Sequence, residues 1–436
     1  MPSHALSWRL TPLEAMARWP ASVPLGALVS GDDSPWSRWS VLAVPGAWQS
    51  LRAGATRTAC IDWLRQRTQG ARDGDTPFDG AWLLQLGYEL GASLEPATNA
   101  AARGNDGWPL AQAAPVRVAA VHDAQTGTWM RVGNAPDAWP AIEDAMTRPA
   151  HAGSFALDTL QASSTDDDYA SLVTRTREYI RAGDLFQANV ARLWEGDGHG
   201  DARAFALAAL GHSHARYGAW LETPAGCVAS MSPELFLHAE RDGSVITRPI
   251  KGTRPADADT NEFMRSGKDA AELHMIVDLM RNDLSRACEP GSVRVLEARA
   301  AEPHATVLHG VAQIHGRLRR DRDLADLIAA TFPPGSITGA PKVRAMQVIR
   351  ELEGFDRGPF YGAIGLLGGD GSLSLNVAIR TATLQRHGTA WRVRYAAGCG
   401  IVSDSDPAEE VRETHAKAAV LHRAADALRS ATALTG

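Results

Sequence analysis

The chain has 436 residues, of which 44% are hydrophobic and 22% are charged, as in folded globular proteins rather than disordered ones. Its formal net charge of −6 argues against a nucleic-acid partner, and the lack of a long apolar run in the sequence argues against a membrane protein. The four cysteines are far apart and the first thirty residues do not have the pattern of a signal peptide, so we expect reduced thiols and a cytoplasmic protein.

The N-terminal third is rich in Ala, Trp and Pro and contains short strand patterns. Strands are predicted over Trp39–Val44, Ala81–Leu86, Val116–Val121 and Trp129–Val132. The stretch that follows, 136–164, is rich in Ala, Asp and small residues. We predict that this stretch is a linker or a surface excursion.

The middle of the chain contains long helices and runs of strands. The predicted elements are a helix over Asp166–Ala182, a strand over Asp184–Trp194, a short helix over Ala202–Leu210, a β meander over Trp220–Pro255 and a long helix over Thr260–Cys288. Gly183 directly follows the first of these helices, and glycine is typical of a helix C-terminus.

The last hundred residues are predicted to form long strands between two helices. One helix begins at Pro341, strands cover 360–402, and the final helix covers Pro407–Arg429. Along one of these strands apolar residues alternate with Asn376 and Arg380, so we expect these two side chains to face away from the core. Strand runs without regular βαβ alternation predict an α+β fold with antiparallel sheets.

Lys251 lies in a segment with restricted backbone freedom, Thr247–Pro255, in which two prolines and a glycine interrupt strand pairing. A rigid backbone beside a strand end is a suitable place from which to aim an amine. Taken alone, Lys251 fits better an ordinary surface lysine beside a turn, because most lysines are exposed.

Acidic residues recur at helical spacing on two predicted helices. Glu410 and Glu413 share one face of the last helix with Lys417. Asp269 and Glu272 share one face of the earlier long helix. Such groups are usually solvated salt-bridge stripes, but two acidic pairs would also suit Mg²⁺, which prefers oxygen ligands.

Three further features could bind an anion or have an ordinary structural role. Pro334–Lys342 places small residues before a helix, where free N–H groups and the helix dipole favour an anion, although a simple glycine-rich loop is the alternative. Arg380 could pair with a carboxylate or be an ordinary exposed strand arginine. His309 lies in a short apolar stretch that is typical of a core histidine. Together these residues indicate a site for a small dianion with Mg²⁺ and a lysine beside it.

Several long motifs resemble those of the chorismate-utilising enzymes and occur in that family's order. They are AGDLFQANVAR at 182–192, SPELF at 232–236, RPIKGTRP at 248–255, HMIVDLMRND at 274–283, GSITGAPKVRAMQVI at 335–349, NVAIRTA at 376–382 and AGCGIVSDSDPAEEVRETHAKA at 397–418. The resemblance is strong from Tyr169 onward and weaker before it, where 28–43 and 80–91 are similar to the family's opening strands.

The resemblance implies a fold and a domain organisation. It implies a single chorismate-binding domain over 1–436, with 1–150 as a weaker-matching N-terminal portion and 165–430 as the catalytic core. The implied fold is α+β, with two antiparallel β-sheets packed as a sandwich, flanking helices, and the site between the sheets.

Two positions discriminate among members of the family. The family's aminodeoxychorismate synthases carry lysine at the position of Lys251, where its anthranilate synthases carry alanine. Relatives that add water to chorismate have a lysine base at the position of Gln187, and glutamine cannot take a proton from water. The chain is thus most similar to aminodeoxychorismate synthase component I. That enzyme transfers ammonia, supplied by a glutamine amidotransferase subunit, to carbon 4 of chorismate for para-aminobenzoate and folate biosynthesis.

The resemblance also implies roles for individual residues. Lys251 would attack ring carbon 2 and Glu234 would be the acid and base. Glu272, Glu410 and Glu413 would bind Mg²⁺. The substrate-binding residues would be Gln187, Thr253, His309, Ser336, Thr338, Gly339, Phe360, Arg380, Gly398, Gly400 and Lys417.

Two other functions are compatible with the same motifs. The first is anthranilate synthase component I, which Lys251 disfavours. The second is a family member without catalytic activity that acts as a binding subunit. Retention of the expected nucleophile, the expected acid and base, and the metal-binding glutamates disfavours that second function.

Overall fold

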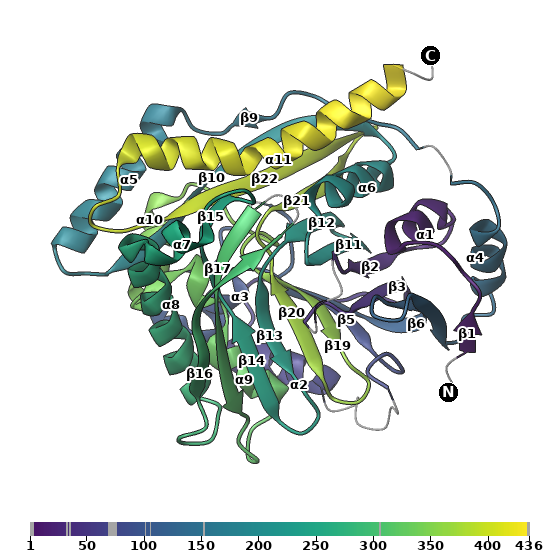
Figure 1. Ribbon diagram of the computed structural model, residues 1–436, viewed down its shortest axis with the longest axis horizontal. Helices are drawn as coiled ribbons and strands as arrows, with labels where there is room; N and C mark the ends of the chain where they lie inside the picture. The colour runs from purple at the N-terminus through teal and green to yellow at the C-terminus, as the bar shows by residue number, and fades with distance from the viewer. Residues whose placement is uncertain are drawn as a thin grey trace.

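A computed structural model describes residues 4–31, 34, 36–68, 76–100, 102–104, 106–150, 153–304 and 307–433. Within these residues the helices are α1 (Pro12–Arg18), α2 (Arg57–Thr68), α3 (Leu90–Leu94), α4 (Trp139–Met146), α5 (Asp166–Arg181), α6 (Ala202–Ser213), α7 (Thr260–Arg265), α8 (Gly267–Ser285), α9 (Leu324–Thr331), α10 (Lys342–Leu352) and α11 (Pro407–Ala433) (Figure 1). None of the helices in the described part of the chain is long and apolar enough to cross a membrane.

The strands fall into two antiparallel groups. Group A contains β1 (His4–Leu6), β2 (Gly26–Val29), β3 (Trp39–Pro45), β6 (Ala111–Asp123), β7 (Thr128–Gly133), β8 (Phe155–Leu157), β9 (Gln161–Ala162), β10 (Gln187–Gly200), β11 (Tyr217–Thr223), β12 (Gly226–Ser232), β18 (Gly339–Ala340), β21 (Thr381–His387) and β22 (Ala390–Ile401). Group B contains β4 (Gln49–Leu51), β5 (Trp82–Leu86), β13 (Leu235–Ala239), β14 (Ser244–Arg248), β15 (Ile250–Pro255), β16 (Arg294–Pro303), β17 (Val307–Arg317), β19 (Ala363–Leu367) and β20 (Leu373–Val377). The α+β class and the antiparallel pairing predicted from the sequence are confirmed.

Strand β6 connects the two groups. Its first residues pair with β4 and β5 of group B, and its later residues pair with β3 and β7 of group A. N-terminal strands also pair with strands from the second half of the chain, since β2 pairs with β11 and β5 pairs with β19. The N-terminal portion is therefore built into the same hydrogen-bonded sheet system as the later strands.

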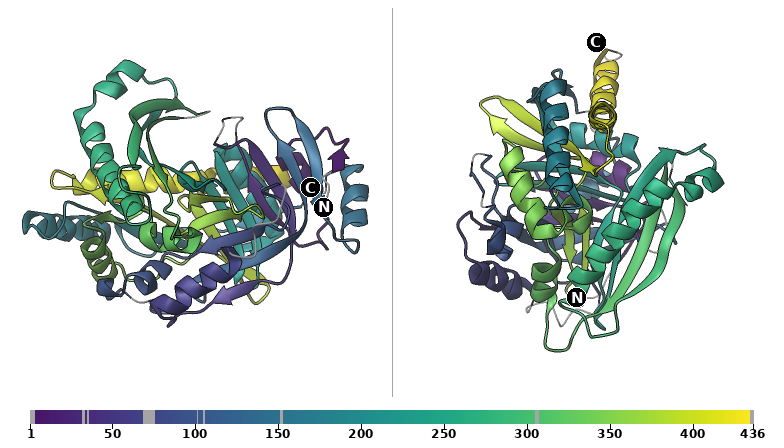
Figure 2. Two further views of the ribbon diagram at one scale, coloured as in Figure 1. Left: turned by 90° about the horizontal axis from the view of Figure 1, so that it is seen from below. Right: turned by 90° about the vertical axis from the view of Figure 1, so that its left-hand side faces the viewer.

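Helices cover the outer sides of these strands. The long helix α11 runs beside β22, between α5 and α6 (Figure 1). Helices α7 and α8 lie against β15, β16 and β17 on another side of the molecule (Figure 2). The strands that carry the predicted site residues thus lie between helices that are far apart in the sequence.

Two predictions about local structure are wrong. The segment 136–164 is not a linker, because it forms α4, β8 and β9, and Trp139, Ile142 and Met146 of α4 are buried. The long helix predicted over 260–288 is interrupted at Ser266, whose backbone is extended and whose hydroxyl accepts a hydrogen bond from the N–H of Asp269 at the start of α8.

The prediction for Asn376 is also wrong. Its side chain is only 4% exposed, because group A covers this face of β20. The Asn376 amide donates to the backbone oxygen of Tyr217 at 2.9 Å, and its oxygen accepts from the N–H of Ile364. A strand with one apolar face can thus be covered on its polar face as well, provided that the polar group is hydrogen-bonded.

Candidate active site

The ends of two predicted site residues, Lys251 and Gln187, meet above Gly400. A Cβ atom placed on Gly400 would lie 2.8 Å from Nε2 of Gln187 and 3.1 Å from Nζ of Lys251. Lys251 comes from β15 in group B, whereas Gln187 and Gly400 come from neighbouring strands of group A. The site is therefore assembled where the two groups of strands approach each other.

The amide of Gln187 is buried without a hydrogen-bond partner among the described residues. Its strand pairs with β18, so that Gln187 lies opposite Ala340 and Ala188 lies opposite Gly339. A Cβ atom on Gly339 would lie 2.1 Å from the backbone oxygen of Gln187, which makes glycine necessary for this close approach. Leaving a buried amide unpaired costs stability, and such a group is well suited to hydrogen-bond a ligand.

Glu234 is a buried carboxyl group close to Lys251. It directly precedes β13, and its backbone is fixed by hydrogen bonds to Ser232 and Val377. Burial raises the pKa of Glu234 to about 7, although the neighbouring Ser336 hydroxyl and the Lys251 ammonium lower it in part. A carboxyl group with this pKa can accept or donate a proton near neutral pH.

Glu410 and Glu413 lie together at the start of α11. With Cys399 of β22 they form a group in which one ligand atom from each residue lies within 4.8 Å of the others. Burial raises the pKa of Glu410, and the carboxylate of Glu413 raises it further. Two carboxylates held this close favour a shared cation, so the oxygen donors fit Mg²⁺. Burial raises the pKa of the Cys399 thiol, and a neutral thiol is a poor ligand for so hard a cation.

Lys417 connects this acidic group to the strand that bears Gly400. Its ammonium donates to the backbone oxygen of Gly398 at 2.8 Å and pairs with Glu413 at 2.7 Å. Burial alone would lower the pKa of Lys417, but its ion pair with the Glu413 carboxylate raises it and the net shift is upward, so the amine stays charged. Gly398, Gly400 and Lys417 thus lie in one connected region.

His309 and Thr253 face each other on paired strands. Nδ1 of His309 lies 3.0 Å from the Thr253 hydroxyl, whereas its Nε2 has no partner among the described residues. Burial lowers the pKa of His309 to about 3, and nearby Arg380 and His304 lower it further. The ring is therefore neutral at physiological pH. Arg380 is half-buried and has a positive φ of 50°, which is unusual for an arginine.

Lys342 is already fully bonded inside the protein, so within the Pro334–Lys342 segment its ammonium is not available to an anion. Its ammonium donates to Asp283 at 2.6 Å and to the backbone oxygens of Thr331 and Pro333, both at 2.7 Å. Within the same segment, Thr338 is buried and its hydroxyl donates to the carbonyl of Pro334. Ser336 and Gly339 lie closest to the groups described above, beside Glu234 and Gln187.

Two predicted residues lie outside these groups. Phe360 is 4% exposed and stacks on Tyr361 with ring centroids 3.8 Å apart. Glu272 lies on α8 and does not belong to the group formed by Cys399, Glu410 and Glu413. Cys399 is the member of that group that the sequence analysis missed, and only its position between Gly398 and Gly400 could have drawn attention to it.

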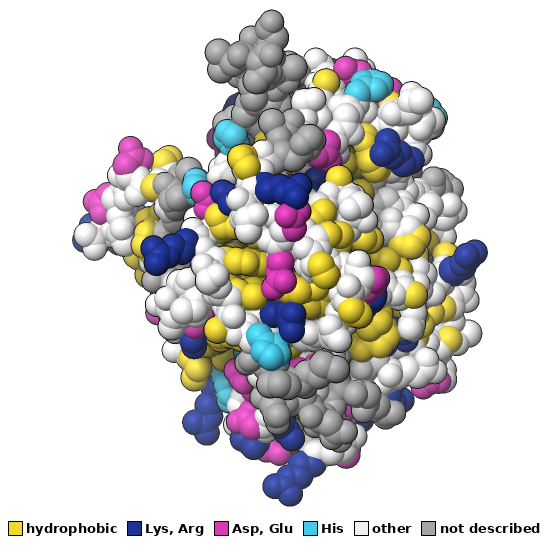
Figure 3. Space-filling view, turned by 90° about the vertical axis from the view of Figure 1, so that its right-hand side faces the viewer, with side chains coloured by type: hydrophobic (Ala, Val, Ile, Leu, Met, Phe, Trp, Pro, Cys, Tyr) yellow, Lys and Arg dark blue, Asp and Glu magenta, His cyan; other side chains and the backbone are white. Residues whose placement is uncertain are grey.

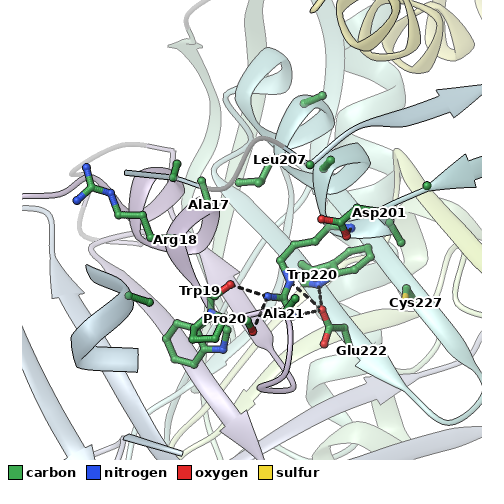
Figure 4. Close-up of a pocket in the computed structure, with 18 of the residues that line it drawn as sticks. Ala17, Arg18, Trp19, Pro20, Ala21, Asp201, Leu207, Trp220, Glu222 and Cys227 are labelled. Carbon is green, nitrogen blue, oxygen red and sulfur yellow. Dashed lines mark hydrogen bonds and ion pairs between the residues drawn. The ribbon is translucent and has the colours of Figure 1, made fainter. Parts of the chain in front are cut away.

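A separate hollow of about 1000 Å³ contains none of the predicted site residues. It lies beside α1, α4 and α6, on the face shown in Figure 3, where hydrophobic side chains are mixed with charged ones. Its walls include Trp220, Leu207 and Glu222 (Figure 4). The buried Arg203 and the partly buried Glu222 there bond to each other, whereas the buried Gln187 amide has no partner among the described residues. The candidate active site is therefore the one at Gln187.

Comparison with known proteins identifies relatives that match most of the chain. A family model described as chorismate binding enzyme matches residues 33–423. The chain is 42% identical over 297 residues to anthranilate synthase component 1 1 of Haloarcula marismortui, an alignment that covers 66% of this chain and 58% of the relative. It is 36% identical over 366 residues to aminodeoxychorismate synthase component 1 of Salmonella typhimurium, covering 79% and 76% of the two chains.

One solved structure shares the fold of this chain over almost the entire length of both proteins. It is anthranilate synthase component I from Streptococcus pneumoniae, which superimposes with a TM-score of 0.76 at 26% identity and covers 95% of this chain and 97% of that one. These relatives thus carry two different activities in their names.

Proposed function

The chain belongs to the family of chorismate binding enzymes, and on this premise we propose that it converts chorismate and ammonia to 4-amino-4-deoxychorismate. The observation that carries the proposal is the position of Lys251, whose amine lies next to the Gln187 amide above Gly400 and close to the buried Glu234 carboxyl. A nucleophilic amine, a proton-transfer group and an unpaired amide are thus brought together at one place.

The proposed reaction begins with a proton transfer. Glu234, as the carboxylate, takes a proton from the Lys251 ammonium, because only a neutral amine can attack carbon. Lys251 then forms a bond to ring carbon 2, the ring double bonds shift, and the bond from carbon 4 to its hydroxyl breaks. Glu234 returns its proton to this leaving hydroxyl, which departs as water.

The second half reaction exchanges one nitrogen for another. Ammonia forms a bond to carbon 4, the double bonds shift back, and the bond between carbon 2 and Lys251 breaks. Lys251 leaves as a neutral amine and the product carries the new ammonium group. The donor and the acceptor of the Gln187 amide have no partner among the described residues, so they can orient the substrate or ammonia, and the amide is not a base that could activate water.

The acidic group on α11 has a supporting role in this proposal. Glu410 and Glu413 would hold Mg²⁺, and Glu272 on α8 is a further candidate ligand. When bound, the ion offsets the negative charge of the ring carboxylate. Lys417 fixes Glu413 and the Gly398 backbone beside it, while Thr253, His309, Ser336, Thr338, Gly339, Phe360 and Arg380 are proposed to complete the substrate site.

The nitrogen source is proposed to be a separate glutamine amidotransferase subunit. Relatives named component 1 support this assignment, because the name implies a second component. We also propose that the strands of groups A and B pack face to face as a sandwich in one domain spanning 1–436, and that the protein is cytoplasmic. The contact of Asn376 in group B with Tyr217 in group A supports the sandwich.

Anthranilate synthase component I is the second candidate, because relatives with that name reach 42% identity. One incubation separates the two. The purified chain is mixed with chorismate, Mg²⁺ and an ammonium salt, and the products are analysed by mass spectrometry and fluorescence. Aminodeoxychorismate without fluorescent anthranilate supports our proposal, anthranilate supports the second candidate, and the absence of turnover would indicate a binding subunit without catalytic activity.

A further inference from the structure

A buried ion pair bonds the two segments that carry Gln187 and Ser336. Glu353 and Arg357 are 3% and 5% exposed and lie just after α10. Nε of Arg357 donates to Oε2 of Glu353 at 2.9 Å, and one terminal nitrogen donates to Oε1 at 2.6 Å. Burial of a charged pair is costly unless further hydrogen bonds satisfy both groups, so the remaining bonds of this pair are informative.

These remaining bonds go to the backbone of the active-site segments. The N–H of Ala191 in β10 donates to Glu353 at 2.7 Å. Arg357 donates to the backbone oxygen of Asn189 at 2.7 Å and to that of Ile337 at 3.3 Å. Asn189 lies two residues after Gln187, and Ile337 lies between Ser336 and Thr338. One guanidinium therefore touches both segments at once.

The pair takes the place of a strand along one edge of β10. This edge pairs with β18 at residues 187–188 and with β9 at residues 194–195. Between these two strands, Asn189 bonds through its N–H to Thr338, and the next groups on the same edge are satisfied by Arg357 and Glu353. The backbone N–H and C=O groups along a buried strand edge need hydrogen-bond partners, and here charged side chains provide them.

Aromatic rings fix the orientation of the arginine. Its guanidinium lies 4.4 Å from the ring centre of Tyr88 and 4.7 Å from that of Tyr361. The hydroxyl of Tyr361 in turn donates to Oδ1 of Asn189 at 2.8 Å. The planar fork of an arginine can reach Glu353, Asn189 and Ile337 together, whereas a lysine offers one ammonium.

We propose that Arg357 and Glu353 are positioning residues that hold the strand bearing Gln187 and the loop bearing Ser336 in the register needed by the active site. Neither residue needs to touch the substrate for this role. The kinetic part of this proposal rests on the proposed function, whereas the structural part does not.

The chain offers a matched control at the hollow beside α6. Arg203 is also buried, at 8% exposure, and donates to Glu222 at 2.7 and 3.0 Å. It further bonds to the backbone oxygens of Trp19 and Pro20, which are drawn with Glu222 in Figure 4. This second pair resembles the first in bonding, although the Glu222 side chain is 25% exposed and that of Glu353 is 2% exposed. It bonds to none of the predicted site segments.

The test compares Arg357→Lys with Arg203→Lys. We expect both variants to lose thermal stability, but only Arg357→Lys to lower kcat/KM for chorismate by at least tenfold at a temperature where both are folded. The kcat/KM of Arg203→Lys for chorismate should stay within twofold of the value for the unchanged protein. A loss of stability in Arg357→Lys with unchanged kcat and KM would overturn the positioning role.

A second measurement does not depend on the reaction. Hydrogen–deuterium exchange of the peptides that cover 187–191 and 335–340 should become at least tenfold faster in Arg357→Lys and not in Arg203→Lys. Unchanged exchange would refute the proposal even if the protein catalyses another reaction. If Arg357→Lys does not fold, Tyr361→Phe is the alternative variant, because it removes the hydrogen bond from the Tyr361 hydroxyl to Asn189 beside the same ion pair. Faster exchange of the 187–191 peptide in this variant would support the proposal, and unchanged exchange would contradict it.

Discussion

Lys251 and Gln187 come from different groups of strands, yet their side chains end above the same bare Cα atom, that of Gly400. A methyl group at position 400 would occupy this space, 2.8 Å from one side-chain nitrogen and 3.1 Å from the other. Both of these contacts are to the ends of flexible side chains, which can move aside. The glycine therefore keeps open the space in which the amine and the amide would meet a substrate.

The first prediction concerns this glycine. Gly400→Ala should lower kcat/KM at least a hundredfold while the melting temperature changes little, because only mobile side-chain ends are displaced. Gly398→Ala is the matched comparison, since its methyl group would meet the backbone oxygen of Val190 at 2.5 Å and should destabilise the fold. Activity assays and thermal unfolding of both variants check this. Full activity in Gly400→Ala would show that the space above Gly400 is not used.

The second prediction concerns the pH dependence of stability. The pKa of Glu234 is about 7 in the folded chain, against an ordinary value of 4.5. Between these two values the unfolded chain gives up this proton while the folded chain keeps it. Stability from Glu234 is therefore complete below pH 4.5 and is lost as the pH rises to 7, by roughly 3 kcal/mol for a shift of this size.

Glu234→Gln should remove this pH dependence, because glutamine stays neutral. The variant should gain stability relative to the unchanged protein as the pH rises from 4.5 to 8, which thermal unfolding at a series of pH values can measure. Glu240→Gln, an exposed change at the other end of β13, should follow the unchanged protein. Parallel curves for all three proteins would mean that the Glu234 carboxylate is not disfavoured by burial.

The third prediction concerns Mg²⁺. Glu410→Gln and Glu413→Gln should each raise the Mg²⁺ concentration for half-maximal activity at least tenfold, because each would remove one of the proposed charged oxygen ligands. Titration with Mn²⁺, followed by its paramagnetic signal, should show the same loss of affinity without any turnover. Cys399→Ser and the exposed Glu409→Gln are the controls. Activity that persists without a divalent cation would contradict the assignment.

The fourth prediction concerns the covalent intermediate. Incubation with chorismate and Mg²⁺ in the absence of ammonia should leave the ring attached to Lys251, with the mass of chorismate less one water. Digestion and mass spectrometry would locate the modification in the peptide that contains Lys251. Lys251→Ala should give no adduct and is the control. If the Lys251 peptide is unmodified in the unchanged protein, the covalent route is wrong, although the overall reaction could still occur.

The sequence indicated which residues belong to the candidate site, but it did not indicate how they lie relative to one another. Lys251 and Gln187 were singled out by motif, but no spacing along the chain indicates that they meet, since this depends on pairing between distant strands. Periodicity failed for Asn376, because alternation identifies an apolar face and says nothing about what covers the polar face. Composition failed for α4, whose three buried side chains lie in a segment otherwise rich in small and polar residues.

The roles of buried charges were the least predictable. The Pro334–Lys342 segment was compatible with an anion site or with a simple loop, and nothing in the sequence indicated that Asp283, 59 positions before Lys342, holds its ammonium. Arg357 and Glu353 are four residues apart, a spacing that is common on exposed helices, and their bonds to β10 exist only in the folded chain. The role of such residues can be recognised only when the backbone groups to which they hydrogen-bond are known.

The last prediction concerns the nitrogen source. Glutamine hydrolysis by an amidotransferase needs a reactive thiolate. All four cysteines of this chain are buried, and burial raises the pKa of each thiol, to about 12 for Cys227 and about 11 for Cys288. These cysteines are therefore poorly suited to attack glutamine.

The purified chain should accordingly turn over chorismate with ammonium salts and not with glutamine. Turnover with ammonium should increase as the pH rises above neutral, because an amine of this basicity is mostly protonated at pH 7 and only neutral ammonia can attack carbon. Glutamine should support turnover only after a glutamine amidotransferase subunit is added. Assays of both donors, with and without that subunit, check this. Glutamine-dependent turnover by the single chain, abolished by replacing one cysteine with alanine, would refute the assignment of glutamine hydrolysis to a separate subunit.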